Sequence, residues 1–113
     1  MKKESLFNSE LDKVVVRIKK MEQYMDEVLA ILEKCPDSIK DDESIKMKIA
    51  ELENYQESGQ WLLDYEADER GELPAELKRG VLSEDMLYNL LCDVNKAEIY
   101  GEKIQVAEVR NHN

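Results

Sequence analysis

The chain has 113 residues and a net charge of −10, with only four Gly and two Pro. This length suits a single domain with a modest core, and so few Gly and Pro residues argue against an all-β fold and against a disordered, low-complexity chain. Residues 1–40 hold eight basic and eight acidic residues, so the whole acidic excess lies in residues 41–113. We expect no direct binding of DNA or RNA, because no basic stripe is present to neutralise phosphates.

The first predicted helix runs from Ser9, as its N-cap, to Cys35, where Pro36 disfavours helical geometry in the preceding residue. Residues 1–8 are expected to be disordered. Apolar residues recur with alternating spacings of three and four, which is the pattern of a seam that packs on a partner helix. These residues are Leu11, Val14, Ile18, Met21, Met25, Val28, Leu32 and Cys35, and Val15, Tyr24 and Ile31 widen the stripe.

A turn is expected from Pro36 to about Asp42, followed by a second helix with Asp41, Asp42 or Ser44 as its cap. Its apolar seam continues through Ile45, Ile49 and Leu52, and the helix is expected to end or bend near Glu57. Two helices joined by a short loop form an antiparallel hairpin.

The segment from Ser58 to Leu91 has a helix-terminating residue at each junction. The pattern predicts a Ser58-capped helix to about Glu69, a left-handed stop at Gly71, and a helical turn that begins at Pro74. Gly80 is expected to close that turn in the left-handed conformation. Ser83 is expected to cap a third long helix, with Leu82 and Leu87 as a hydrophobic staple across the cap.

The third long helix is defined by Leu87, Leu90, Leu91 and Val94, and its seam continues toward Ala97 and Ile104. Residues 110–113 are expected to be disordered. The predicted fold is therefore all-α, a single domain over residues 1–113. It consists of a long antiparallel helical hairpin, a turn-rich segment and a third long helix, an arrangement like a three-helix bundle.

Two sequence motifs within the central segment resemble those of a known family. They are S-G-x-W-L-x-D-Y-E-A-D-E-x-G-x-L-P and L-K-R-G-V-L-S-E-D-x-L-Y. They are similar to an uncharacterised bacterial family of small acidic helical proteins, a domain of unknown function (DUF4298-like), over Ser58 to Leu91. The resemblance implies a bacterial, cytoplasmic, mostly helical protein, and it supplies no activity and no catalytic residue.

The densest acidic run is the best candidate for a metal site, since hard cations prefer several carboxylate oxygens. Its candidate ligands are Asp64, Asp68, Glu69 and Glu72, with Glu66 in the same run. The run lacks the pattern of a calcium loop, and helical metal sites usually take ligands from two or more helices. We therefore expect no metal and no cofactor, and interpret the run as a surface partly neutralised by Lys78 and Arg79.

Three aromatic residues, Trp61, Tyr65 and Tyr88, are candidates for a partner-binding surface. The favoured interpretation places such residues in the core where helices meet. The two cysteines, Cys35 and Cys92, have no metal-ligand spacing and are predicted to be buried free thiols. The only histidine, His112, lies near the chain end, which argues against histidine-dependent catalysis.

These features favour a small non-enzymatic interaction or regulatory protein with no catalytic residues. Two alternatives stay open: an acidic mimic or inhibitor of a nucleic-acid-binding protein, and a metal-dependent hydrolase that uses the central carboxylates. The wide stripe of the first helix predicts a homodimer, and the acidic surface fits a protein partner with a basic surface. A cytoplasmic location without membrane contact is expected, because the longest apolar run, Val28 to Leu32, is too short to span a bilayer.

Overall fold

The computed structural model describes residues 2–100, which hold helices and turns and no strand. The all-α prediction is therefore confirmed. The helices are α1 (Lys2–Lys34), α2 (Ser38–Asp41), α3 (Glu43–Glu57), α4 (Gln60–Glu69) and α5 (Met86–Tyr100), with one 3₁₀ turn, η1 (Gly80–Leu82). None of these helices combines the length and apolar character that crossing a membrane requires.

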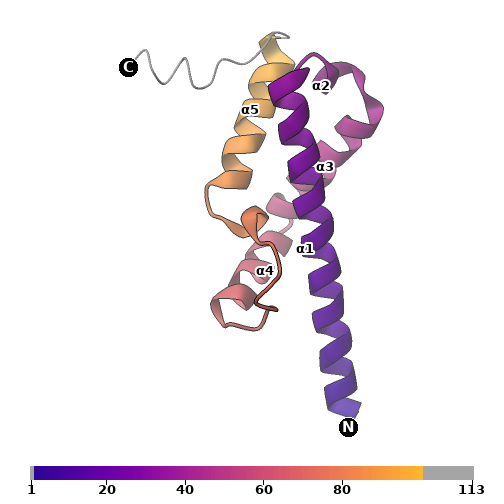
Figure 1. Cartoon of the computed structure of the whole chain (residues 1–113), viewed down its shortest axis with the longest axis vertical. Coiled ribbons are helices and arrows are strands. Elements are labelled where there is room, and N and C mark those ends of the chain that lie inside the picture. Colours follow the sequence, from indigo (N-terminus) through magenta and orange to yellow (C-terminus); the bar gives the residue numbers. More distant parts are fainter. Residues whose placement is uncertain (1, 101–113) are drawn as a thin grey trace.

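The axis of the molecule is α1, whose 33 residues span about 50 Å at 1.5 Å per residue. In Figure 1, α3 and α5 lie on either side of its upper half, α4 lies lower, and the N-terminal end of α1 extends past them all. The predicted hairpin is present as α1 and α3. The prediction of a helix end before Pro36 is also confirmed, since α1 ends at Lys34.

The core forms where the apolar stripe of α1 meets α3 and α5. The stripe, predicted from its spacing, is buried along the middle and C-terminal part of α1. Buried apolar residues from α1, α2, α3 and α5 are Ile18, Met21, Met25, Val28, Leu32, Ile39, Ile45, Ile49, Leu52, Tyr55, Leu87, Leu90, Val94 and Ala97. From the segment after α4, Leu73, Leu77, Val81 and Leu82 are buried in the same core.

Several helix ends follow the sequence rules. Asp42 caps α3, because its Oδ1 accepts hydrogen bonds from the backbone N–H of Ser44 at 2.9 Å and of Ile45 at 3.2 Å. Gly71 has a φ of +74°, as predicted for the residue that stops α4. The N–H of Glu72 donates to the carbonyl of Ala67 at 3.0 Å, and the N–H of Gly71 to that of Asp68 at 2.9 Å. This pair of bonds is a Schellman motif.

Other predicted ends are wrong. The helix α1 begins at Lys2, so Ser9 is not its N-cap, and the expected disorder of residues 1–8 stays a prediction. No Gly or Pro lies between Lys2 and Ser9 to stop the helix. Residues 36–42 contain the short helix α2 instead of an irregular turn. The burial of Ile39, which is 0% exposed, stabilises this helix against the core. The expected disorder of residues 110–113 and the seam position Ile104 lie outside the described residues.

The turn-rich segment differs most from its prediction. Ser58 ends α3, and Gly59, with a φ of +91°, stands before α4. Pro74 begins only a single turn, in which the N–H of Leu77 donates to the carbonyl of Pro74 at 3.2 Å, and no helix continues to Arg79. The Arg79 guanidinium instead donates to the backbone carbonyls of Pro74 and Leu77. The helix α5 begins at Met86, so Ser83 is not its N-cap.

The cysteine prediction is also partly wrong. Both thiols are free, but Cys35 is exposed and Cys92 is half-buried. Cys35 lies just past the last residue of α1, where the chain leaves the helix. In a longer α1, Cys35 would continue the apolar stripe and face the core. Because the helix ends before it, Cys35 faces solvent instead.

Candidate interaction surface

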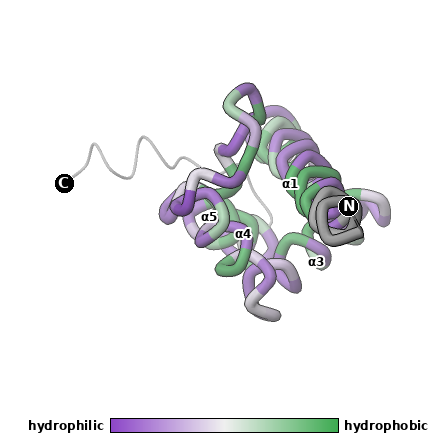
Figure 2. The backbone as a smooth tube through the Cα atoms, turned by 90° about the horizontal axis from the view of Figure 1, so that it is seen from below, coloured by the Kyte–Doolittle hydropathy of each residue, from purple (hydrophilic) through white to green (hydrophobic). Residues whose placement is uncertain are grey.

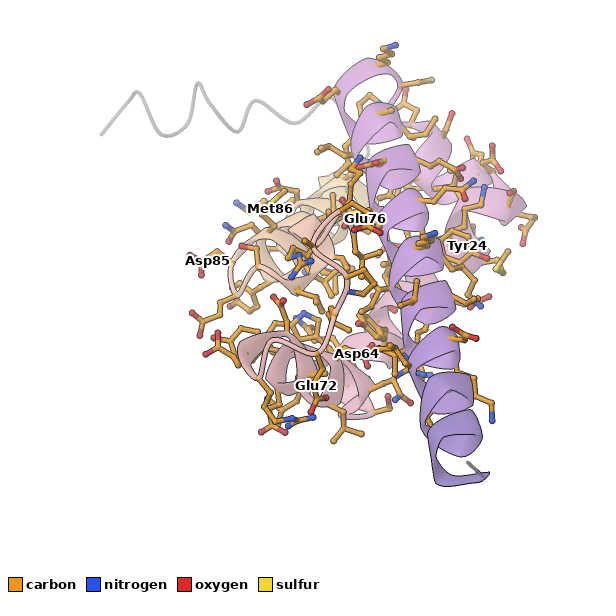
Figure 3. The ribbon with its side chains drawn as sticks, turned by 60° about the horizontal axis from the view of Figure 1, so that its bottom comes forward. Tyr24, Asp64, Glu72, Glu76, Asp85 and Met86 are labelled. Carbon is orange, nitrogen blue, oxygen red and sulfur yellow. The ribbon has the colours of Figure 1, made fainter. Side chains whose placement is uncertain are left out.

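The carboxylate of Asp64 lies inside the protein rather than on its surface. Its side chain is only 1% exposed, and Figure 3 shows it between α4 and α1. Its Oδ1 accepts from Arg17 Nη2 at 2.6 Å, and its Oδ2 accepts from Arg17 Nε at 2.9 Å. The same Oδ2 accepts the O–H of Tyr55 at 2.7 Å. One buried carboxylate therefore joins α1, α3 and α4.

The charges around Asp64 are set by these contacts. Burial raises the pKa of Tyr55 above its ordinary value, and the hydrogen bond to Asp64 raises it further. The hydrogen bond to Asp64 also raises the pKa of Arg17. Tyr55 therefore stays a neutral donor and Arg17 a charged one at physiological pH. A buried carboxylate with every oxygen engaged in this way is an anchor for α4.

The other candidate ligands are held apart by separate partners. Asp68 pairs with the guanidinium of Arg79. Glu72 accepts from Arg70 Nε at 2.9 Å and lies on the outside of the loop after α4 (Figure 3). Glu69 is exposed. Arg79 neutralises the run as predicted, whereas Lys78 pairs with Asp26 of α1 at 3.4 Å.

This arrangement does not support the hydrolase hypothesis. Arginine guanidinium groups take up the carboxylate oxygens of Asp64, Asp68 and Glu72 that a metal site would need. Among residues 10–99, whose side chains the structure describes, no three Asp, Glu, His or Cys side chains come together in a way that could hold a metal ion. The interpretation of Asp64 as part of a surface run is wrong, because its side chain is buried. The sequence did not reveal the partners that stabilise it there.

Trp61 has one edge inside the protein and one outside. Its indole N–H donates to the backbone carbonyl of Val81 in η1 at 2.8 Å. Its ring stacks on that of Tyr65, with centroids 5.1 Å apart and an interplanar angle of 16°. Both rings are half-buried, so neither predicted role, core or exposed platform, describes them fully. Trp61 attaches α4 to η1 and leaves part of the stack accessible.

The outward side of α4 carries its leucines. Leu62 is 50% exposed, although it is next to Trp61, which was predicted to lie in the core, and Leu63 is 59% exposed. Glu66 and Glu69 are exposed on the same side, since positions 62, 66 and 69 share a helix face. We call Leu62, Leu63, Tyr65, Glu66 and Glu69 the outer face of α4.

Carboxylates surround the tyrosine of this face. The negative charge of Glu69, and then that of Glu84, raises the pKa of Tyr65. Glu84 precedes α5, so the outer face of α4 lies within electrostatic reach of the start of α5. Tyr88 in the first turn of α5 is 59% exposed, as its assignment to a partner surface would require. The outer face of α4 is therefore apolar and aromatic, with carboxylates beside it.

Sequence reasoning missed three residues that position this surface. They are Arg17 and Tyr55, which hold Asp64, and Glu22, a buried carboxylate of α1. Glu22 Oε1 accepts the backbone N–H of Val81 at 2.9 Å. An ideal Cβ on Gly80 would lie 3.0 Å from Glu22 Oε2, so Gly80 is needed for this close approach and not for a left-handed turn. Glu22 and Arg17 are polar residues beside the α1 stripe, and nothing in their spacing identifies a partner dozens of residues away.

One family model matches most of the chain. The family model described as a domain of unknown function (DUF4298) matches residues 18–101. The chain belongs to this family. The match is wider than the resemblance over Ser58 to Leu91, because it includes the C-terminal half of α1, all of α3 and α5 to its end. No curated protein and no solved structure matches the chain.

The DUF4298 match covers every residue of the Asp64 network except one. Tyr55 and Asp64 lie within residues 18–101, and Arg17 directly precedes this range. The outer face of α4 and Tyr88 also lie within the matched region. The family description assigns no activity, so the function of this chain has to be argued from its geometry.

Proposed function

We propose that this DUF4298 protein is a non-enzymatic interaction protein that binds a basic, amphipathic segment of a partner protein on the outer face of α4. The observation that carries the proposal is the inversion of α4, which buries Asp64 and exposes Leu62 and Leu63. A surface helix ordinarily buries its leucines and exposes its carboxylates. The opposite arrangement makes an apolar surface available to another molecule.

Charge selects the class of partner. The helix α4 has four acidic residues and no basic residue. Asp64 and Asp68 are neutralised within the chain by Arg17 and Arg79. Glu66 and Glu69 are exposed and, within the described residues, form no ion pair. A partner with apolar residues for the leucines and Lys or Arg for these carboxylates is complementary in both respects.

A cytoplasmic location belongs to the same proposal. Both cysteines are free, and Cys35 is exposed to solvent. Exposed free thiols persist in reducing compartments and tend to be oxidised outside them. A cytoplasmic partner is therefore the expected kind.

The test is affinity capture from the cells that naturally make the protein, with three versions as bait. These are the wild type, the double variant Leu62→Ser/Leu63→Ser, and the control Ile99→Ser, which changes a residue of α5 that is 63% exposed. We expect a partner that the wild type and the control retain and the double variant loses. Its binding should weaken with salt, since it depends in part on charge.

The partner must also bind directly. A synthetic peptide of its basic amphipathic segment should bind the wild type and not the double variant in a fluorescence anisotropy titration. A partner recovered equally by all three baits would contradict the proposal. A partner displaced by DNA would instead favour the mimic hypothesis from the sequence.

A further inference from the structure

Val16, near the middle of α1, is an apolar side chain that the chain itself leaves largely uncovered. Val14, Val15 and Val16 are consecutive, so they point to different sides of the helix. Val14 and Val15 are half-buried against the core, whereas Val16 is 65% exposed. Three β-branched residues in a row are poor helix formers. This stretch therefore depends on packing, and packing is present on only one of its sides.

A groove lies beside Val16, between α1 and the C-terminal half of α3. Its volume is about 580 Å³. Val16 forms part of its wall, and the buried side chains of Met21 and Tyr55 contribute to its lining. The charged residues at its edge include Lys20 of α1 and Glu51 of α3, which form an ion pair at 3.2 Å. The lining of the groove thus combines apolar side chains with charges of both signs.

The charge distribution favours a second copy of this chain as the occupant of the groove. Two copies of a chain with a net charge of −10 repel each other through most of their surface. The charged residues that line the groove are Lys13, Arg17 and Lys20 with Asp12 and Glu51, so its lining lacks the acidic excess of the whole chain. This is the part of the protein where two copies meet with the least repulsion. Figure 2 shows α1 and α3 on one side of the molecule, with α4 and α5 on the other.

The shape of the molecule agrees with a second copy. Figure 1 shows the N-terminal part of α1 projecting beyond the other helices. A helix without tertiary contacts is only marginally stable in water. Two hairpins that pack α1 and α3 against their counterparts would give each projecting helix a neighbour and form a four-helix arrangement.

We propose that the α1–α3 groove is the interface through which two copies of this chain associate about a two-fold axis, with Val16 at its centre. In a two-fold interface the same surface serves both copies, so one substitution changes the contact twice. This self-association site is separate from the outer face of α4. The dimer therefore leaves two outer faces free for partners.

The experiment is light scattering coupled to size exclusion, from micromolar to near-millimolar protein. The wild type should have twice its chain mass of 13.2 kDa. Val16→Lys adds a positive charge beside Lys20 in both copies and should weaken dimerisation by about tenfold or more. Ile99→Lys, an exposed apolar residue of α5, should leave the dimer intact. Circular dichroism and denaturant midpoints should show that both variants remain folded.

Salt provides a second readout. Screening of the net repulsion between two acidic copies should strengthen the dimer as salt increases, the opposite of the salt effect expected for the partner at α4. A wild type that has the monomer mass at every concentration would overturn the proposal. So would a Val16→Lys variant that dimerises as well as the wild type. Partner binding by a monomeric Val16→Lys variant would leave the function proposed for α4 unaffected.

Discussion

The helices α4 and α5 are attached to the same core by opposite means. The helix α5 buries Leu87, Leu90, Val94 and Ala97. The helix α4 buries only Asp64 and Ala67 and is held by polar contacts to three other elements. Polar anchors have fixed partners and directions, so they can position a helix without using its leucines. In α4 the leucines remain available for binding, whereas α5 uses its leucines for stability.

The largest expected difference between the two helices comes from the same substitution in each. Leu87→Ala removes a side chain that is 1% exposed, and it should lower the free energy of unfolding by about 3–4 kcal/mol. Leu62→Ala removes one that is 50% exposed, and it should cost under about 1 kcal/mol. Urea unfolding followed by circular dichroism measures both. Equal losses would mean that α4 packs its leucines as α5 does.

The next effect concerns the anchor itself. Asp64→Asn keeps the shape but removes the charge that faces Arg17, so a guanidinium is left without its counter-charge. Removing one partner of a buried pair costs about 3–5 kcal/mol, and we expect about 2–3 kcal/mol because Arg17 is 26% exposed to water. Glu66→Gln, at an exposed position of the same helix, is the control and should change stability by less than about 0.5 kcal/mol. If Asp64→Asn left the free energy of unfolding unchanged, Asp64 would not be an anchor for α4.

A smaller effect is expected at the turn that receives Trp61. Gly80→Ala places a methyl group 3.0 Å from the Glu22 carboxylate, and it should cost about 1–2 kcal/mol. In a Glu22→Ala background the same change should be nearly neutral, because the obstructing carboxylate is gone. The two substitutions thus form a double-mutant cycle with a clear coupling energy. Additive losses would show that Gly80 is needed for a reason other than Glu22.

Tyr55 gives the smallest effect at neutral pH and a distinct one in alkali. Tyr55→Phe removes one hydrogen bond to Asp64 and should cost about 1 kcal/mol near pH 7. Because the folded protein raises the pKa of Tyr55, the unfolded chain loses this proton first as pH rises. The stabilisation is therefore complete below the unfolded value of 10 and declines above it. The stabilities of the wild type and Tyr55→Phe should converge above about pH 10, and a constant difference would contradict the raised pKa.

The sequence predicted those parts of the fold that depend on local rules. The α1 stripe follows from apolar spacing, the end of α1 from Pro36 and the end of α4 from Gly71, and the N-cap of α3 is one of the three cap candidates, Asp42. The anchors could not be predicted in this way. Asp64 is 47 residues from Arg17 along the chain, and Glu22 is 59 residues from Val81. Periodicity predicts which side of a helix is apolar and therefore buried. It could not predict α4, because in this helix a carboxylate, that of Asp64, is buried.

The most direct test of the central claim is the reactivity of single cysteines along α4 in a Cys35→Ser/Cys92→Ser background. Cysteines would be placed at four positions, Leu62→Cys, Leu63→Cys, Ala67→Cys and, in α5, Leu90→Cys. The rate of modification by a thiol reagent is compared between the folded and the urea-unfolded protein. We predict nearly unprotected thiols at positions 62 and 63, and strong protection at positions 67 and 90, whose native side chains are 8% and 4% exposed. Protected thiols at 62 and 63 with a reactive thiol at 67 would contradict the inverted orientation of α4.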